Sequence, residues 1–592
     1  MKMLRSIALA TALGCSILNT AFAEEAERPG APHLLPAETL AYLRVANVPE
    51  LVEKFRDTAT GRIAADEQVK PFVSDLYSSA AEAFQIVEER VGVPLHELLA
   101  IPQGELCLAL VAAEQGPPQV VAFFDVGDHL FAAEQVIESA ETALATQGAT
   151  RTTKLVDKTE IVIQTMPGDR QRRVAYFVRD EVIGVSSDEE VLAQILAVWD
   201  GDEVNSLADN RTFTAIMKRS VGFKEEPPQI TWYVDPFSLA KRVTRGNFSA
   251  QAGISLLSGL GLDGVKAVGG SLILATDEFD GIFHIHAMLE NPRNGVLKMI
   301  AFEAGEVTPE PWVPKDAASY ASLNWNVDKT YDELTRLYDT FRGEDAWENQ
   351  VVKRLQDGLG LDLEKEFIDG LEGRATLVQW MQRPARLNSQ SNLIGFKLKD
   401  PDQARGTLDR IAAKFPQTLE RKTYGGATYY SAPSPGRRRN GGQQDPEIMR
   451  VPTPCLAILG DYFLLTDNEK LFEQVVMTKS DASLSLANEL DYKLIANKIQ
   501  RQQGETKAGM ISFNRPEEGF RTLYELATAS ATQSRLAAAS ENNRAFRALN
   551  GALTNNPLPP FAVLARYLAP GGALVTDDET GIHYTAFSLR RD

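Results

Sequence analysis

Two histidines near the middle of the chain have the spacing of a pair of metal ligands. His284 and His286 alternate along the strand-like stretch IFHIHAML, so both side chains lie on one face of the strand. A zinc site needs at least a third protein ligand. The other candidate histidines are dispersed along the sequence: His33, His96, His129 and His583. We therefore expect an exposed polar strand face here instead of a metal site.

Two acidic turns occupy equivalent places in the two halves of the chain. The segments TDEFDG (residues 276–281) and TDDETG (residues 576–581) each lie between strand-like stretches and end in glycine. Clustered carboxylates could bind calcium, but hairpin turns favour aspartate and glycine for conformational reasons alone. We expect hairpin connections whose carboxylates point into water and no effect of calcium on the unfolding temperature. The carboxylates belong to Asp277, Glu278, Asp280, Asp577, Asp578 and Glu579.

Two other motifs match known sites only in part. Gly259, Gly261 and Gly264 have the GxGxxG spacing of a dinucleotide site, but a helical stretch precedes them and a strand follows, which reverses the required order. His96 begins an HExxH zinc motif that has Ala100 where the second histidine is needed. The sequence contains no Walker loop, paired CxxC or GxSxG elbow. It therefore predicts no catalytic residue, no cofactor-binding residue and no metal ligand.

Several aromatic residues gather towards the middle of the chain. Carbohydrate and peptide sites use exposed aromatic rings, but core packing uses them more often. We expect these rings to pack inside the protein. They are Trp232, Tyr233, Trp312, Trp325, Trp347 and Trp380.

The elements that would position these residues form one ordered series that occurs twice, in two halves of nearly equal length. Both halves contain a strand, a tight turn, a second strand and a helix in succession, at residues 173–196 and 455–476. Both also contain a hairpin pattern, at residues 154–164 and 422–431. Shared single residues are Pro36/Pro314, Tyr42/Tyr320, Asn47/Asn326 and Val48/Val327. The series predicts an α+β fold of two tandem, similar domains built of largely antiparallel sheets with amphipathic helices.

Local signals refine this prediction. Capping boxes are expected at Ser187/Glu190 and Thr466/Glu469, before a helix over residues 188–199 and its counterpart. Two segments break the parallel between the halves, and in place of the first of them the first half has only the shorter MPGDRQRR (residues 166–173). Residues 433–447 form a polar loop rich in proline and glycine, and the alanine-rich residues 515–550 predict one long helix or two stacked helices.

The N-terminus has the composition of a secretory signal peptide. Lys2 and Arg5 precede an apolar run that ends in Ala21-Phe22-Ala23, which predicts cleavage before Glu24. Lipidation at Cys15 is the alternative, but Leu13 lies where a small residue is usual. The predicted organisation is a signal peptide (1–23), a linker (24–33), a first repeat domain (34–306), a linker (307–312) and a second repeat domain (313–592). The protein is expected to be exported to the bacterial periplasm or the extracellular space.

Charge, hydropathy and cysteine content limit the partners, the membrane segments and the disulfides that we expect. The formal net charge of −19 disfavours nucleic acid and anionic lipid head groups. No transmembrane segment is expected after signal cleavage, because the apolar residues 252–275 include Asp263 and Lys266. Cys107 and Cys455 are expected to be buried free thiols, and a disulfide between them is the alternative.

The opening sequence LLPAETLAYLRVANVPELVEKFRDTATGRI (residues 34–63) resembles an uncharacterised family of exported bacterial proteins, a domain of unknown function, with internal duplication. The resemblance implies export and duplicated architecture and assigns no functional residue. We therefore expect a non-enzymatic binding or scaffolding protein of the cell envelope, with an unknown envelope or extracellular partner. The alternative is a hydrolase with an acidic site in the cleft between the domains.

Overall fold

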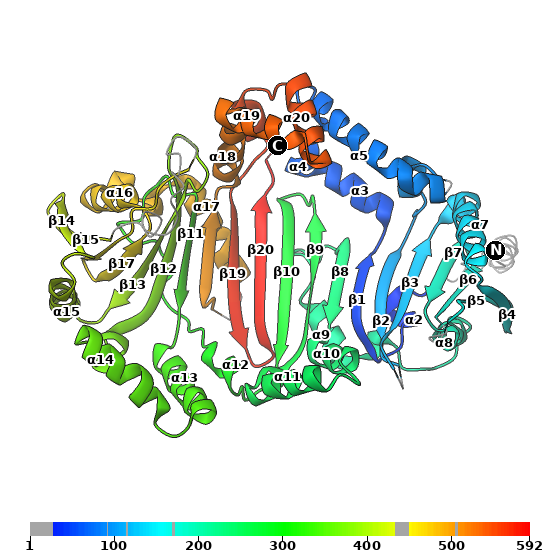
Figure 1. Ribbon diagram of the computed structural model, residues 1–592, viewed down its shortest axis with the longest axis horizontal. Coiled ribbons are helices and arrows are strands. Elements are labelled where there is room, and N and C mark those ends of the chain that lie inside the picture. Colours follow the sequence, from blue (N-terminus) through cyan, green and yellow to red (C-terminus); the bar gives the residue numbers. More distant parts are fainter. Residues whose placement is uncertain are drawn as a thin grey trace, which may run out of the picture.

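The computed structural model describes residues 28–91, 93–113, 116–168, 172–432, 449–503 and 507–591. The predicted signal peptide, Cys15 and the predicted loop at residues 433–447 lie outside the described residues. In the described part, twenty strands form one sheet, and every strand pairing within it is antiparallel (Figure 1). The predicted α+β class is confirmed.

The first half of the chain contributes ten strands and the helices between them. The strands are β1 (Thr39–Val45), β2 (Leu106–Val111), β3 (Gln119–Asp125), β4 (Thr150–Val156), β5 (Thr159–Thr165), β6 (Arg173–Arg179), β7 (Val182–Ser186), β8 (Ile230–Val234), β9 (Val265–Leu274) and β10 (Phe279–Leu289). The α-helices are α2 (Ala31–Leu34), α3 (Val48–Asp57), α4 (Ala59–Ala65), α5 (Lys70–Val91), α6 (Leu95–Ala100), α7 (Leu130–Thr146), α8 (Glu189–Trp199), α9 (Arg211–Lys218), α10 (Pro236–Val243), α11 (Phe248–Gly259) and α12 (Val296–Met299).

The second half contributes the other ten strands. They are β11 (Ser319–Asn324), β12 (Leu371–Met381), β13 (Gln390–Leu398), β14 (Glu420–Tyr424), β15 (Ala427–Ser431), β16 (Cys455–Leu459), β17 (Tyr462–Thr466), β18 (Met510–Asn514), β19 (Gly571–Asp578) and β20 (Gly581–Leu589). The helices are α13 (Val327–Arg342), η4 (Glu348–Val352), α14 (Lys353–Leu359), η5 (Leu363–Ile368), α15 (Pro401–Lys414), α16 (Glu469–Ser480), α17 (Leu490–Gln502), α18 (Pro516–Thr528), α19 (Ser530–Ser540), α20 (Arg544–Asn555) and α21 (Phe561–Ala565).

The strands of each half pair in the same order. In the first half the order is β4-β5-β6-β7-β3-β2-β1-β8-β9-β10, and in the second it is β14-β15-β16-β17-β13-β12-β11-β18-β19-β20. The pairing of β10 with β20 joins them, so the sheet continues through the boundary between the halves. The predicted division into two tandem domains is therefore not confirmed.

Equivalent side chains perform the same task in both halves. Asn47 caps α3 by accepting a hydrogen bond from the Glu50 amide at 2.9 Å, and Asn326 caps α13 through the Lys329 amide at 2.8 Å. One face of the sheet carries matching ring contacts, Tyr42 with Phe213 (5.4 Å) and Tyr320 with Tyr492 (6.1 Å). We call this the covered face, because α8, α9, α16 and α17 pack on it.

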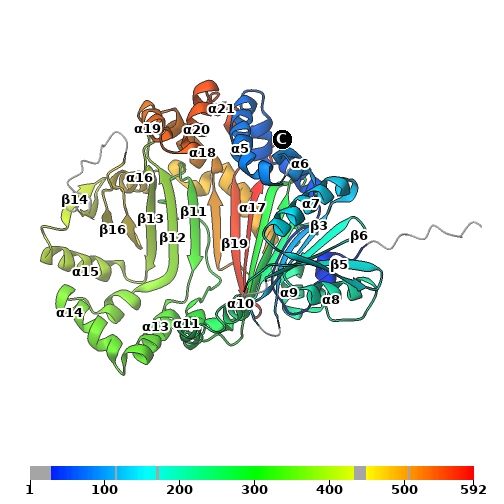
Figure 2. The same ribbon diagram turned by 45° about the vertical axis from the view of Figure 1, so that its right-hand side comes forward.

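Two rows of helices run along the ends of the strands (Figures 1 and 2). One row combines α3–α5 of the first half with α18–α20 of the second, and the other combines α10–α12 with α13 and α14. Polar contacts join the halves in the first row: Asp66 accepts a hydrogen bond from the Tyr567 hydroxyl at 2.8 Å, and Asp75 accepts one from the Asn556 amide at 2.7 Å. None of the helices in the described residues combines the length and apolar character needed to cross a bilayer.

Several local predictions need correction. The caps of α8 and α16 are Asp188 and Asn468, one and two residues beyond the predicted Ser187 and Thr466, and each accepts from the second helical amide. The predicted caps have other partners, since Ser187 accepts from the Val120 amide and Thr466 from the Asn468 amide. The alanine-rich segment forms three helices, α18, α19 and α20, because the chain turns between them. Both predicted hairpins are confirmed as β4–β5 and β14–β15.

Candidate functional site: an open apolar face of the sheet

The predicted polar strand face at His284 and His286 is wrong. Both side chains lie on the covered face and are 3% and 0% exposed. The β10–β20 pairing places His583 directly opposite His286, and Nε2 of His583 lies 3.3 Å from Nδ1 of His284. The rings of His284 and His583 stack with centroids 5.4 Å apart. The structure thus brings His583, which is distant in the sequence, beside His284 and His286.

This histidine cluster is held uncharged by burial. Burial lowers the pKa of His284 and of His286 to about 4. The pKa of His583 falls to about 3, first through burial and then through the two neighbouring imidazoles. Among the described residues, no group of three or more histidine, cysteine, aspartate or glutamate side chains could hold a metal ion.

The carboxylates of the acidic turns are mostly paired, whereas we expected them to point into water. Glu278 forms an ion pair with Lys224 at 3.1 Å, and Asp578 forms one with Arg219 at 2.6 Å. Asp577 accepts from Arg293 at 2.9 Å. Only Asp277 and Glu579 are exposed, as expected for all six. The segments do form hairpin turns, and their paired carboxylates brace neighbouring loops.

Asp280, on the first of these turns, accepts a hydrogen bond from the Ala59 amide at 2.6 Å, and burial raises its pKa.

The remaining motifs have structural roles. Gly261 follows α11 at φ +79°, where a Cβ atom would lie 2.4 Å from the Asn294 carbonyl oxygen, so the GxGxxG segment ends a helix and begins β9. His96 lies exposed on α6, and its nearest acidic partner is Glu97, with 3.8 Å between Nε2 and Oε1. The two cysteines, Cys107 and Cys455, are buried free thiols.

Two of the six aromatic residues, Tyr233 and Trp312, are buried, as expected. Trp312 contacts Tyr462 with ring centroids 5.4 Å apart, and Trp325 contacts Phe302 at 4.9 Å. The other four, Trp232, Trp325, Trp347 and Trp380, are half-buried. Of these, Trp232 lies on the face of the sheet opposite the covered face.

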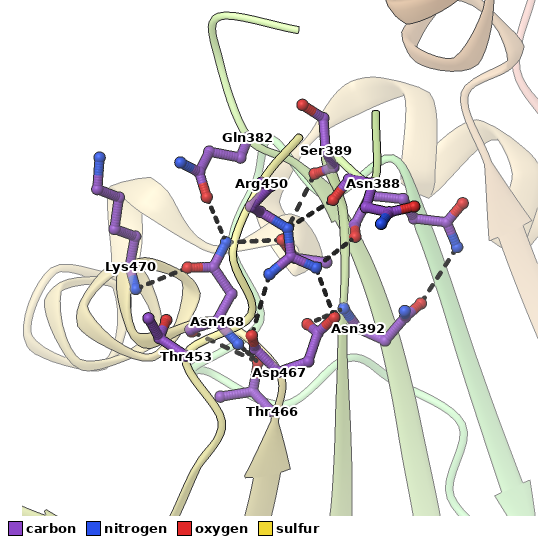
Figure 3. Close-up of polar contacts among 12 residues, drawn as sticks. Gln382, Asn388, Ser389, Asn392, Arg450, Thr453, Thr466, Asp467, Asn468 and Lys470 are labelled. Carbon is purple, nitrogen blue, oxygen red and sulfur yellow. Dashed lines mark hydrogen bonds and ion pairs between the residues drawn. The ribbon is translucent and has the colours of Figure 1, made fainter. Parts of the chain in front are cut away.

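A dense polar network lies at the start of α16 (Figure 3). Arg450 directs its guanidinium nitrogens at the carbonyl oxygens of Asn388, Gln390 and Asp467 and at the Asp467 carboxylate, 2.6 Å away. Asn468 donates to Gln382 at 2.8 Å and to Ser391 at 2.6 Å. Because the Arg450 guanidinium is occupied mainly by backbone carbonyls, the network anchors the chain where it returns from residue 448 and provides no reactive group.

On the face of the sheet opposite the covered face, two adjacent rows of side chains are apolar along almost their whole length. Residues that lie directly opposite one another across antiparallel strands point to the same face, so the registers define rows of neighbours. One such row is Val185, Ala122, Leu108, Leu43, Trp232, Gly270, Ile285, Tyr584, Val575, Met510, Leu323, Ala375, Phe396, Phe463 and Ile458.

The adjacent row is Val178, Ile183, Phe124, Leu106, Val45, Ile230, Leu272, Phe283, Ala586, Ala573, Ser512, Ala321, Leu377, Ile394, Leu465 and Leu456. Neither row contains a charged or amide side chain.

Helices cover this face near its two ends. Near one end, α7 packs on Phe124, Ile183 and Val185, and near the other α15 lies over Phe463. Between them, and between the two rows of helices, no helix of the described residues crosses in front of the central strands (Figure 1). We call this central part of both rows the open face.

Several large apolar side chains on the open face are accessible to solvent, whereas Ala573 and Val575 near its middle are only 3% and 7% exposed. Leu43 and Leu108, on neighbouring strands, are 48% and 50% exposed, and Leu377 and Ile394 in the other half are each 37% exposed. Scattered exposed leucines are ordinary, but a contiguous apolar patch of this kind marks a binding surface. A signal for it exists in the sequence: LCLALV (β2) and ITWYV (β8) are apolar or aromatic at nearly every position, not only at alternate ones.

Comparison with known proteins gave no relatives. No family model, no curated protein and no solved structure matches this chain.

Proposed function

We propose that the protein is an exported, non-enzymatic binding protein whose open face takes the apolar part of an amphiphile with an acyl chain. The observation that carries the proposal is the unbroken pair of apolar rows across the central strands. Burying this surface against a ligand would gain about 25 cal/mol for each Å² removed from water.

The chemistry of the rows favours an acyl chain over an extended peptide. Along the open face, the side-chain hydrogen-bonding groups that the two rows present are the Ser512 and Tyr584 hydroxyls and the Trp232 indole N–H. A peptide strand lying on this surface would leave its backbone N–H and C=O groups without partners, at a substantial cost in free energy. A hydrocarbon chain has no such groups, so it loses nothing on leaving water.

The proposal also includes export of the protein and its organisation as two similar halves. A signal peptide over residues 1–23 would deliver the protein to the periplasm or the extracellular space, where lipids and other amphiphiles pass between membranes. The two halves, proposed here as paired repeat domains with boundaries at residues 34–306 and 313–592, each contribute one half of the open face.

The test is binding of cis-parinaric acid, a fluorescent fatty acid, to the full chain. The double substitution Leu43→Glu with Leu108→Glu places two carboxylates on the open face and is expected to weaken binding at least tenfold. Both side chains are already about half exposed, so the unfolding midpoint should stay near that of the unmodified protein.

Leu155→Glu is the matched control. Leu155 is a strand leucine that is 71% exposed on the edge strand β4, far along the sheet order from β1 and β2. Its substitution should leave binding unchanged. An unmodified protein that binds no fatty acid, or equal losses in the double variant and the control, would refute the proposal.

The alternative, a hydrolase with an acidic site between the halves, has less support. A pocket of about 230 Å³ near the joint is lined by Glu306, Glu310 and Tyr462, among others. Arg374 forms ion pairs with both glutamates, at 3.4 Å and 3.0 Å. Carboxylates held in this way serve an ion-pair network, and the binding function remains our proposal.

A further inference from the structure

At the second-half end of the open face, the sheet and α15 enclose an apolar pocket. Its volume is about 190 Å³, and its lining is mostly hydrocarbon. The lining includes Phe463 and Ile458 from the sheet, Ala404, Leu408 and Ile411 from α15, and Phe367 from η5. Phe463 and Ile458 are also the last two members of a row described above, so the pocket continues the open face without a polar break.

In the described part of the first half, buried side chains fill the equivalent position. By strand register, Ile183 and Val178 occupy the positions that Phe463 and Ile458 occupy in the second half. There, α7 closes on the sheet, and Ile183, Ala133, Val126 and Ile101 form a buried cluster. The space between the sheet and its covering helix is therefore filled by side chains under α7 but leaves a pocket under α15.

We infer that this pocket receives the methyl end of the acyl chain whose remainder lies on the open face. The inference rests on the proposed function and assigns a place to one end of the ligand. The volume is suitable, since a cavity of about 150 Å³ lined by leucine, isoleucine and phenylalanine binds benzene, a six-carbon ring. The terminal carbons of a saturated chain need no hydrogen-bond partner, which matches the apolar lining.

Polar side chains at the pocket are already engaged, so they do not compete for a ligand head group. Glu366 pairs with Arg410 and accepts from Thr407 at 3.2 Å. Asp400 caps α15 by accepting from the Gln403 amide at 2.9 Å. The head group therefore remains on the open face, outside the pocket.

The experiment measures the affinity of the full chain for saturated fatty acids from ten to eighteen carbons by calorimetry. If the end of the chain enters the pocket, affinity should rise about fourfold for each added methylene until the pocket is full. Ala404→Leu fills the pocket and should remove this dependence for the longer chains. Its matched control, Ala413→Leu, introduces the same residue on the exposed side of the same helix and should retain it.

Stability separates pocket filling from misfolding. Ala404→Leu should unfold at the same temperature as Ala413→Leu or higher, because a filled cavity gains contacts. Should Ala404→Leu fold poorly, the smaller Ala404→Val serves instead. Equal chain-length dependence in the Ala404 and Ala413 variants overturns the pocket inference while leaving the proposed function intact. Absence of binding by any fatty acid to the unmodified protein overturns both.

Discussion

Acidification from pH 7 to pH 5 is expected to destabilise this protein steeply through the histidine cluster at the β10–β20 pairing. Burial holds the pKa of His284 and His286 at about 4 and that of His583 at about 3, whereas an unfolded histidine titrates near 6.5. Below about pH 6.5 the unfolded chain therefore binds protons that the folded protein does not, and the free energy of unfolding falls as pH falls. The full stabilisation is present above pH 6.5, and the loss ends only near the folded pKa values.

The expected slope is large. For each histidine that stays neutral in the folded state, the free energy of unfolding falls by up to about 1.4 kcal/mol for every unit by which the pH is lowered. Three of them together approach roughly 4 kcal/mol per pH unit. Denaturant unfolding at a series of pH values between 7 and 5 measures this slope. In that range a carboxylate such as Asp578, whose pKa is about 2, stays ionised in both states and contributes little.

Two variants identify the source of the slope. His583→Gln should reduce the number of protons taken up on unfolding by about one. His96→Gln removes a histidine whose side chain is 70% exposed and should leave the slope unchanged. A slope that is the same in both variants would show that the cluster does not control the acid response.

The second large effect is expected from Arg374→Ala. The Arg374 side chain is 7% exposed and the Glu310 side chain 4% exposed, with 3.0 Å between Nη2 and Oε1. Removing the guanidinium leaves a buried carboxylate without its counter-charge, which costs about 3–5 kcal/mol. The measurement is the change in the free energy of unfolding at pH 7.

A second substitution tests the reason for this loss. Replacing both partners, as Arg374→Met with Glu310→Met, should recover much of the stability, because no buried charge then lacks a partner. Arg405→Ala, at an exposed ion pair with Asp402, is the control and should change stability by less than about 1 kcal/mol. A double variant as unstable as the single one would contradict the electrostatic explanation.

The first half contains an equivalent buried ion pair in which the acidic and basic residues have exchanged places. Strand register makes Glu105 the counterpart of Arg374, since Tyr42 faces Ala109 as Tyr320 faces Val378. Glu105 is bonded by Arg28 at 2.6 Å and by the Ala31 amide at 3.0 Å, so it ties the segment before β1 to the sheet. Arg374 likewise ties the segment before β11 through Glu306 and Glu310. No local pattern in the sequence indicates this exchange, because each pair joins residues more than sixty positions apart.

Local structure was largely predictable from the sequence. Local apolar patterns predicted β6, β7 and both hairpins, and the series of patterns predicted the order in which strands and helices follow one another. The caps of α8 and α16 were displaced by one or two residues, because Ser187 and Thr466 accept hydrogen bonds from the amides of Val120 and Asn468 and do not cap the helices.

What the sequence alone determined is the set of elements, since helix and strand periodicity act over a few residues. Only the tertiary structure decided which faces are covered. His284 and His583 are 299 positions apart, and their contact depends on the β10–β20 pairing between the halves. Likewise, a strand that is apolar at nearly every position has two apolar faces, but its sequence does not indicate whether a helix packs on each face. The open face exists because α9 and α17 cover one side of the central strands and no described helix covers the other.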